Sequence, residues 1–176
     1  MENIFNTDKK IRLGIWGLGR GRTFINLCSK LNIEVIAGCD YSEPLCEEFR
    51  KICPDAFITH DEDEFLAQDF DAVLVATYFF THTRDSIKAL NAGKHVLCEK
   101  PMALTMEECE RMVEASKKYS PKMMVGQICR YTPAFKLAKQ LIEQGLQINI
   151  VGILRPDPNN IMSTGMGSIG YRTDLM

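Results

Sequence analysis

The chain has 176 residues, of which 45% are hydrophobic and 25% are charged. This composition is typical of a globular domain and excludes an intrinsically disordered chain. A formal net charge of -2 and a pI of about 5.9 give no electrostatic reason to expect nucleic acid or an anionic membrane as a partner. A small-molecule substrate is the class of partner that remains.

The start of the chain and its cysteines bear on its location. The first ten residues, MENIFNTDKK, lack the apolar core of a secretory signal, and the longest uncharged apolar run, residues 72–80, is too short to span a bilayer. We therefore expect a cytoplasmic protein. The seven cysteines show no C-x-x-C spacing and no matching histidine pair, so we expect reduced, buried thiols and neither a disulfide framework nor a metal site.

The first predicted elements are strand, turn and helix. Residues 11–16, IRLGIW, form a short apolar run that stops in glycines, and apolar residues at helical spacing follow over 22–31. A second apolar run over 34–40 predicts the next strand. Ser42 with Pro44 marks the start of the next helix, because serine accepts bonds from free backbone amides and proline is tolerated in the first turn.

The same alternation continues along most of the chain. The further predicted elements are, in order, a weak strand at 57–58, a helix over 61–67, a strand over 72–77, a helix over 81–91, a strand over 95–99, a helix over 106–119, a strand over 122–126 and a helix over 133–145. Gly93 is expected to end the helix before it in a left-handed conformation. Thr105 and Glu108 have the spacing of a capping box.

Crossovers of this length demand parallel strands with helices on both faces. We therefore predict the α/β class, with a doubly wound, mostly parallel, Rossmann-like sheet. Residues 1–126 are predicted to form a dinucleotide-binding domain. Ligands of such sheets bind beyond the carboxyl ends of the strands, near the point where the strand order reverses.

The turn after the first strand reads Gly17-Leu18-Gly19-Arg20-Gly21-Arg22. Glycines there let the backbone approach a pyrophosphate, which lies at the amino end of the following helix, where free amides and the helix dipole favour an anion. The fit to G-x-G-x-x-G is imperfect, because Arg22 stands at the third glycine position and Gly21 falls one place early. We predict that these six residues bind a dinucleotide; the alternative is that the glycines only allow a tight turn.

Asp40 closes the second strand, where a dinucleotide fold needs a carboxylate to accept bonds from the adenosine ribose hydroxyls. A carboxylate there repels a ribose phosphate, and the next residue, Tyr41, offers no positive charge to offset that repulsion. The expected cofactor is therefore NAD(H), with NADP(H) less favoured. In the alternative interpretation, Asp40 opens a turn or caps the next helix.

Three segments, DAVLVATYFFTH, ALNAGKHVLCEKPMALTMEE and CRYTP, resemble the successive signatures of the Gfo/Idh/MocA family of nicotinamide-dependent oxidoreductases. The likeness runs from about residue 12 to residue 145. In that family the Glu-Lys-Pro segment lies beside the nicotinamide, its Lys-Pro bond is often cis, and the lysine contacts substrate and assists proton movement. The resemblance thus implies that Glu99, Lys100 and Pro101 border the cofactor and that Lys100 is catalytic. The alternative for Lys100 is a surface salt bridge with Glu99.

The resemblance implies weaker roles elsewhere. Thr77 and His82 match a Thr-Pro-x-x-x-His segment that wraps the cofactor, although Tyr78 replaces the usual proline. Tyr78 packs along the cofactor or covers the following helix, and the sequence leaves both open. Arg130 matches an Arg-Tyr-x-Pro segment that shapes the cleft, with an ion pair as the alternative. His60 lies in an acidic loop and is given no role.

The carboxyl end departs from the family pattern. Members carry a second α+β domain with substrate contacts, the oligomer interface and a histidine, whereas residues 127–176 predict a helix, a strand and a turn-rich stretch without histidine. We expect that domain to be missing or vestigial, with 127–176 as its remnant. The resemblance implies hydride transfer between NAD(H) and a hydroxyl or carbonyl carbon of a sugar-like or polyol substrate, by a homo-oligomer if the second domain is present. The alternative is a non-catalytic NAD(H)-binding module or sensor.

Overall fold

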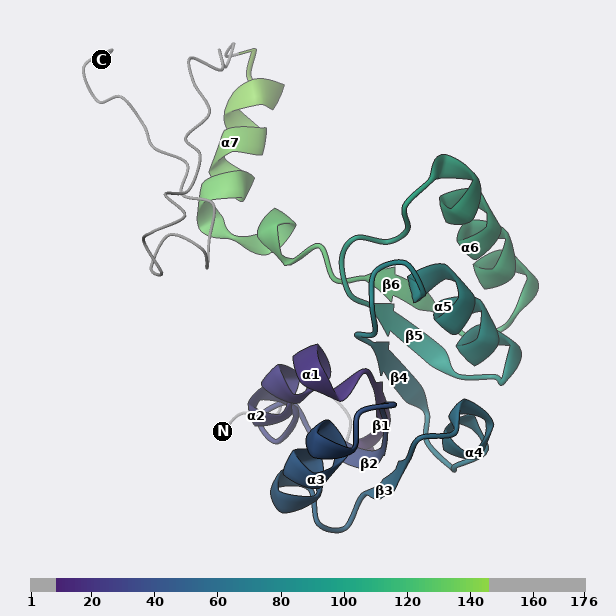
Figure 1. Ribbon diagram of the computed structural model, residues 1–176. Helices are drawn as coiled ribbons and strands as arrows, with labels where there is room; N and C mark the ends of the chain where they lie inside the picture. Colours follow the sequence, from purple (N-terminus) through teal and green to yellow (C-terminus); the bar gives the residue numbers. More distant parts are fainter. Residues whose placement is uncertain (1–8, 146–176) are drawn as a thin grey trace, which may run out of the picture. The chain divides into compact units, whose positions relative to one another are not determined.

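The computed structural model describes residues 9–145, which divide after Gln127 into two units. The first unit is built on a six-stranded sheet with the order β3-β2-β1-β4-β5-β6 (Figure 1). All its described strand pairs are parallel, so the predicted α/β class and doubly wound sheet are confirmed. The strand order reverses between β1 and β4, which places the expected ligand crevice at the ends of these two strands.

The strands are β1 (Ile11–Trp16), β2 (Ile33–Cys39), β3 (Phe57–Thr59), β4 (Ala72–Val75), β5 (His95–Cys98) and β6 (Met123–Val125). Trp16 at the end of β1 lies opposite Cys39 of β2 on one side and opposite Val75 of β4 on the other. The carboxyl ends of the three central strands therefore meet in one place. Residues that follow these strands are brought together although they are far apart in the chain.

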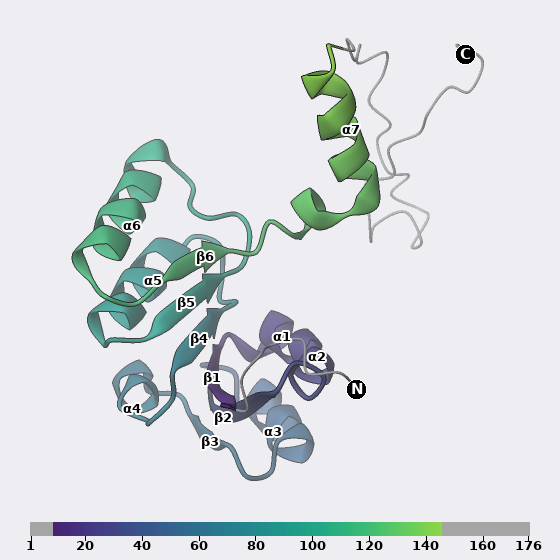
Figure 2. The same ribbon diagram turned by 180° about the vertical axis from the view of Figure 1, so that it is seen from behind.

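The helices of the first unit are α1 (Leu18–Gly21), the 3-10 turn η1 (Arg22–Phe24), α2 (Ile25–Cys28), α3 (Glu43–Ile52), α4 (Glu62–Leu66), α5 (His82–Asn91) and α6 (Met106–Lys118). Figures 1 and 2 show α1, α2 and α3 gathered beside β1 to β3, and α5 with α6 beside β4 to β6. Two apolar cores fill the two faces of the sheet. In β4, Val73 and Val75 belong to one core and Leu74 to the other, as successive residues of a strand buried on both faces must.

Local sequence signals explain most of the helix ends. Thr105 accepts from the Glu108 amide at 3.2 Å while the Glu108 carboxylate accepts from the Thr105 amide, so the predicted capping box is confirmed. Gly93 has a φ of +78° after α5, as predicted. Ser42 differs from its prediction, because its side chain caps no amide of α3. Its backbone carbonyl accepts from the amides of residues 45 and 46 instead.

The second unit is described only over 128–145. It contains the 3-10 turn η2 (Ile128–Tyr131) and the helix α7 (Pro133–Glu143). The structure thus contains the helix that was predicted over 133–145. None of the residues of α7 is buried. Across 9–145, no helix is long and apolar enough to cross a membrane. The predicted strand and the turn-rich stretch after Gly145 lie outside the described residues.

All seven cysteines are free in the described residues. Four of them are buried, and burial raises the pKa of the Cys98 thiol to about 11. Cys129 is exposed, contrary to the expectation of buried thiols, because it lies in η2, which has no buried residue.

Candidate cofactor site

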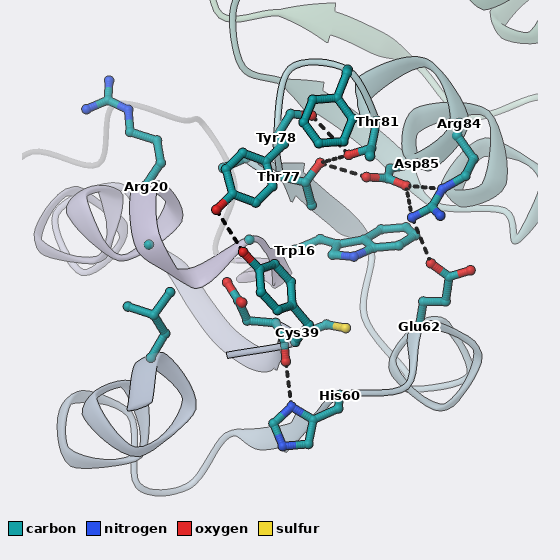
Figure 3. A pocket seen from close by; sticks show the side chains of 17 residues that line it. Trp16, Arg20, Cys39, His60, Glu62, Thr77, Tyr78, Thr81, Arg84 and Asp85 are labelled. Carbon is teal, nitrogen blue, oxygen red and sulfur yellow. Dashed lines mark hydrogen bonds and ion pairs between the residues drawn. The ribbon is translucent and has the colours of Figure 1, made fainter. Parts of the chain in front are cut away.

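A cavity of about 610 Å³ opens where β1, β2 and β4 end (Figure 3). Its walls come from the glycine turn after β1, the end of β2, and the segments that follow β3 and β4. The predicted site residues in this wall are Gly17, Gly19, Arg20, Asp40, Thr77 and Tyr78. Those outside it are Leu18, Gly21, Arg22, His82, Glu99, Lys100 and Pro101. Arg130 lies in the second unit, and its role stays a prediction.

Gly17 makes the turn after β1 by itself. Its φ is +94°, and a Cβ at this position would lie 2.4 Å from the carbonyl carbon of Ala76, so no other residue fits. Its amide donates to the Cys39 carbonyl at 2.9 Å, which joins the turn to the end of β2. Because one residue completes the turn, α1 begins at Leu18, earlier than the predicted start at residue 22.

Gly21 serves the packing role that the third glycine of the fingerprint normally has. A Cβ on Gly21 would lie 2.3 Å from Cγ2 of Ile15, so glycine alone lets the helix approach β1 this closely. Arg22, one place later, does not line the cavity and pairs with Glu48 of α3. The departure from G-x-G-x-x-G therefore leaves the packing of helix on strand intact.

Asp40 joins the end of β2 to the glycine turn. Its carboxylate accepts the Leu18 amide at 2.7 Å through Oδ2 and the Ser42 amide at 2.9 Å through Oδ1. The residue is only 8% exposed, yet it lines the cavity. Each carboxylate oxygen has two lone pairs, so one on each oxygen remains for a ligand hydroxyl. Asp40 also opens a turn, as in the alternative interpretation, and the two roles are compatible.

His60 lines the cavity, although the sequence gave no reason to single it out. Its Nδ1 lies 2.7 Å from the Asp40 carbonyl oxygen and its Nε2 lies 2.5 Å from Oε2 of Glu43. Both partners are acceptors, so the protonated ring can donate to both of them. These bonds, chiefly the one to the Asp40 carbonyl, raise the pKa of His60. His60 thus holds the backbone of Asp40 from the side opposite the glycine turn.

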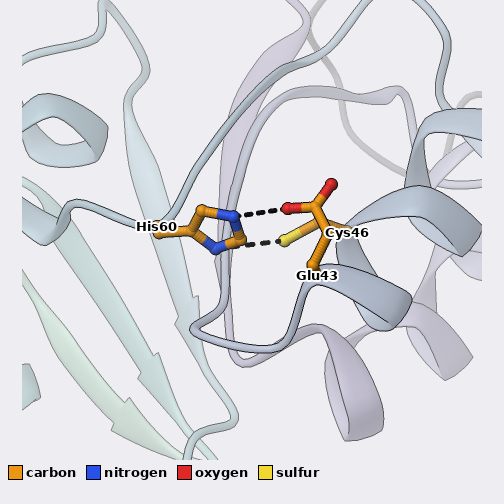
Figure 4. A group of neighbouring side chains, drawn as sticks. All are labelled: Glu43, Cys46 and His60. Carbon is orange, nitrogen blue, oxygen red and sulfur yellow. Dashed lines mark hydrogen bonds and ion pairs between the residues drawn. The ribbon is translucent and has the colours of Figure 1, made fainter.

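The cluster of Glu43, Cys46 and His60 has the composition of a metal site, with potential ligand atoms within 4.8 Å of one another (Figure 4). Hydrogen bonds account for it without an ion. The ligand atoms of His60 and Glu43 are already engaged, since His60 contacts Glu43 and Glu43 also accepts from Arg50 at 2.6 Å. Burial raises the pKa of the Cys46 thiol, which disfavours the thiolate that a metal needs.

A chain of hydroxyl and carboxylate groups lies after β4. Thr81 Oγ1 donates to Thr77 Oγ1 at 2.9 Å, and Thr77 Oγ1 donates to Oδ2 of Asp85 at 2.6 Å (Figure 3). Asp85 is fully buried and pairs with Arg84 at 2.7 Å. These hydrogen bonds fix Thr77 in the cavity wall. Asp85 was not singled out from the sequence, because Thr77 lies in the segment between β4 and α5 and no helical spacing relates the two residues.

Glu99 follows β5 and is 7% exposed. Its Oε1 accepts from Nε and Nη2 of Arg20 at 3.0 and 2.9 Å, and its Oε2 accepts the Lys100 amide at 2.9 Å. The alternative salt bridge between Glu99 and Lys100 is therefore not formed, because Arg20 takes its place. The Lys100 side chain is exposed and makes no ion pair with any residue from 9 to 145. The Lys100–Pro101 bond is cis, as the resemblance implied.

His82 is buried at the start of α5, with 1% of its surface exposed. Its Nδ1 lies 2.7 Å from the Pro101 carbonyl oxygen and its Nε2 lies 3.2 Å from that of Thr77. The imidazole therefore links the segment after β4 to the cis-proline segment. This geometry suits a positioning role, since the ring does not reach the cavity.

A model of the family described as "Oxidoreductase family, NAD-binding Rossmann fold" (Gfo/Idh/MocA) matches residues 11–127. The inositol 2-dehydrogenase/D-chiro-inositol 3-dehydrogenase of Shouchella clausii is 33% identical over 142 residues, which cover 77% of this chain and 41% of that protein. The chain thus spans less than half the length of this relative. An inositol 2-dehydrogenase of Pseudomonas fluorescens is likewise 33% identical, over 141 residues.

Solved structures agree with the sequence comparison. The WlbA dehydrogenase of Bordetella pertussis, in complex with NADH and UDP-GlcNAcA, aligns with a TM-score of 0.73 at 31% identity. The scyllo-inositol dehydrogenase of Lactobacillus casei, with bound NAD(H) and scyllo-inositol, aligns with a TM-score of 0.70 at 29% identity. The alignments cover 79% and 78% of this chain, and 41% and 42% of the two structures.

Proposed function

Because the chain belongs to the Gfo/Idh/MocA oxidoreductase family and contains its NAD-binding Rossmann fold, we propose that it takes part in hydride transfer between NAD(H) and a hydroxyl or carbonyl carbon of a sugar-like or polyol substrate. The chain carries mainly the nucleotide-binding half of that activity. The observation that supports this best is the Asp40 carboxylate, which closes β2, is bonded to the glycine turn and lines the same cavity.

The residues present fit a dinucleotide. Gly17 brings the backbone within a distance that a side chain would prevent, and a Cβ on Gly19 would find its nearest neighbour at 3.4 Å, so packing alone does not demand glycine there. Gly19 and Arg20 in the wall would then face the pyrophosphate. Asp40 would accept the ribose hydroxyls and disfavour a 2′-phosphate, so NAD(H) is preferred over NADP(H).

Lys100 is the residue proposed to handle the substrate proton. Bound NAD supplies the carbon that accepts or releases hydride. The Lys100 amide is held by the Glu99 carboxylate, and its ammonium extends freely from that fixed backbone. In reduction, an ammonium there would donate its proton to the oxygen on the reacting carbon as charge develops, and in oxidation the neutral amine would accept the proton of the substrate hydroxyl. His82 and Arg20 would position this segment without touching the reacting atoms.

The proposal also covers properties that follow from the family resemblance. We place the protein in the cytoplasm, with a sugar or polyol as its small-molecule partner. Self-association would accompany a second domain of the family type. The roles of Thr77, Tyr78 and Arg130 near the cofactor stay predictions.

The first test is titration of NADH and NADPH into the chain, followed by nucleotide fluorescence, with Asp40→Ala and Lys100→Ala variants. NADH should bind more tightly than NADPH. Asp40→Ala should weaken NADH binding about 10-fold or more, the effect of losing hydrogen bonds to a charged group. Lys100→Ala is the matched control and should bind NADH like the unaltered chain, because its side chain lies outside the cavity wall.

Tighter binding of NADPH, or no binding by a folded chain, would contradict the proposal. Turnover is then measured with NAD and a panel of polyols. Turnover that Lys100→Ala abolishes while NADH still binds supports the enzyme. Binding without turnover would favour the alternative of a non-catalytic NAD(H)-binding module.

A further inference from the structure

The backbone carbonyl of Asp40 is held by a side chain that follows β3. His60 lines the cavity, and its Nδ1 lies 2.7 Å from the Asp40 carbonyl oxygen (Figure 3). The thiol of Cys46 lies 3.5 Å from the same oxygen, which makes it a weaker second donor. At its carbonyl, Asp40 is therefore held chiefly by the imidazole.

The other bonds of Asp40 are made to backbone groups. Its carboxylate accepts the amides of Leu18 and Ser42 at 2.7 and 2.9 Å, and its own amide donates to the Thr59 carbonyl at 3.4 Å. Backbone amides do not titrate near neutral pH. The bond from His60 is therefore the one among these that a change of pH in this range can alter, because imidazole titrates there.

The protonation state of His60 decides whether both ring nitrogens can donate. Nε2 lies 2.5 Å from Oε2 of Glu43, on the other side of the ring from Asp40 (Figure 4). A protonated ring donates from both nitrogens, whereas a neutral ring has one donor and one acceptor. The neutral ring must therefore leave either the Asp40 carbonyl or Glu43 without a bond. In the first case Asp40 loses its partner, and in the second the ring that bonds it is fixed from one side only.

The surroundings of His60 favour its protonated form. The titratable groups around it are Asp40 at the end of β2, Glu43, Cys46 and Arg50 of α3, and Asp61 and Glu62 at the start of α4. Asp61 accepts the first amides of α4, and Glu62 is paired with two cations of α5. Glu43 stays ionised because Arg50 lowers its pKa, and burial raises the pKa of Cys46, which stays a thiol. The bonds to the Asp40 carbonyl and to Glu43 therefore raise the pKa of His60.

We propose that protonated His60 is a positioning residue of the cofactor site, which holds Asp40 in place for the adenosine ribose and makes NAD(H) bind more tightly when the ring is charged. The inference rests on the proposed function, because Asp40 is the proposed acceptor of the ribose hydroxyls. Both ring nitrogens face acceptors of the protein, so His60 acts through Asp40 and has no donor left for the ligand. Coupling is reciprocal, so bound NADH must in turn favour the protonated ring.

The test is titration of NADH at a series of pH values from about 6 to about 9, followed by nucleotide fluorescence. The affinity should be highest below the folded pKa of His60 and fall by about 3-fold or more as the pH rises through it, the effect of one hydrogen bond. His60→Gln should bind NADH with an affinity that does not change over this range. His95→Gln is the matched control and should keep the pH dependence of the unaltered chain, because His95 is exposed at the start of β5 and does not line the cavity. Thermal unfolding of each variant shows that it is folded.

Nuclear magnetic resonance of the unaltered chain gives a second measurement, which does not depend on any variant being folded. The chain has three histidines, so the titration of each imidazole can be followed separately. Saturation with NADH should move the titration midpoint of the His60 ring to higher pH. A midpoint that stays in place would overturn the proposal.

Asp40→Ala separates action through Asp40 from action on the ligand. This variant keeps the carbonyl that His60 bonds but lacks the carboxylate, so its weaker NADH binding should no longer depend on pH. Dependence that persists in Asp40→Ala would overturn the positioning role, because the charged ring would then act on the ligand directly. An affinity of the unaltered chain that does not change with pH would also overturn it and leave the proposed function standing. No NADH binding at any pH would overturn the proposed function, and this inference with it.

Discussion

Two buried carboxylates follow strands of the first unit, and they are held in different ways. Asp40 after β2 and Glu99 after β5 are 8% and 7% exposed. Asp40 accepts two backbone amides, one from the glycine turn and one from its own turn. Glu99 accepts one amide and a guanidinium that comes from 79 positions earlier in the chain. The fold itself fixes the first carboxylate, whereas the second depends on one side chain.

This difference predicts which substitutions should disturb each of the two carboxylates. Backbone amides cannot be removed by a side-chain substitution, so the surroundings of Asp40 change only when the turn itself is distorted. The Arg20 side chain is 52% exposed and lines the cavity, so one substitution removes the main partner of Glu99. If the proposed function holds, the adenosine end of the site would be fixed by backbone bonds, whereas the Glu99 end would adjust through side chains.

The largest expected effect comes from breaking the turn at the Asp40 end. Gly17→Ala places a Cβ 2.4 Å from the Ala76 backbone at a φ of +94°, so the turn must move and the Leu18 amide with it. We expect the free energy of unfolding to fall by about 3 kcal/mol or more, and NADH binding to be lost. Urea unfolding followed by Trp16 fluorescence measures the first, and NADH titration the second.

Gly93→Ala is the matched control for that substitution. Gly93 has a φ of +78°, but a Cβ there meets nothing within 4 Å. Only the cost of the left-handed conformation, about 1 kcal/mol, should appear, with NADH binding unchanged. Similar losses for the two variants would show that close approach at Gly17 contributes little, and the account of a rigid adenosine end would be wrong.

A smaller effect is expected at the Glu99 end. Arg20→Met leaves the Glu99 carboxylate buried with one amide as its remaining partner, which should lower the free energy of unfolding by about 1–2 kcal/mol. The half-exposed position of Arg20 keeps the loss below that of a fully buried pair. Adding Glu99→Gln should restore part of the stability, because the uncharged amide needs no cation. Losses that simply add in the double variant would contradict the coupling of these two residues.

The order of the elements could be predicted from the sequence because it depends on local pattern. Alternating apolar runs and helical spacing gave the strands and helices of the sheet, and the left-handed Gly93 and the capping box at Thr105 are set by neighbours within a few residues. The conformation of Gly17 could also be predicted, since a tight turn directly after a buried strand often requires a residue with a positive φ. The cis bond before Pro101 came from the family resemblance alone.

The pairing of side chains across strand ends could not be predicted in this way. Arg20 was placed at the phosphates, while its partner Glu99 depends on how far β1 and β5 extend, which no local pattern reports. The same is true of the bond from His60 to the Asp40 carbonyl and of the hydroxyl bond between Tyr41 and Tyr78. These contacts join segments that are close only once the sheet is assembled.

The smallest expected effect is the contribution of His60 to stability at the Asp40 end, and it depends on pH. The bond to the Asp40 carbonyl raises the pKa of His60 above its unfolded value of about 6.5, so its stabilisation is complete below that pH and is lost as pH rises through the folded pKa. Arg50 lowers the pKa of Glu43, which therefore stays ionised throughout this window. Urea unfolding of His60→Gln should show a deficit in the free energy of unfolding below pH 6.5 that shrinks as the pH rises through the folded pKa of His60. Glu43→Gln should show a weaker dependence on pH, because the Asp40 carbonyl remains as a partner. A deficit that does not change with pH would mean that the ring acts by packing, and the adenosine end would then owe its rigidity to backbone bonds alone.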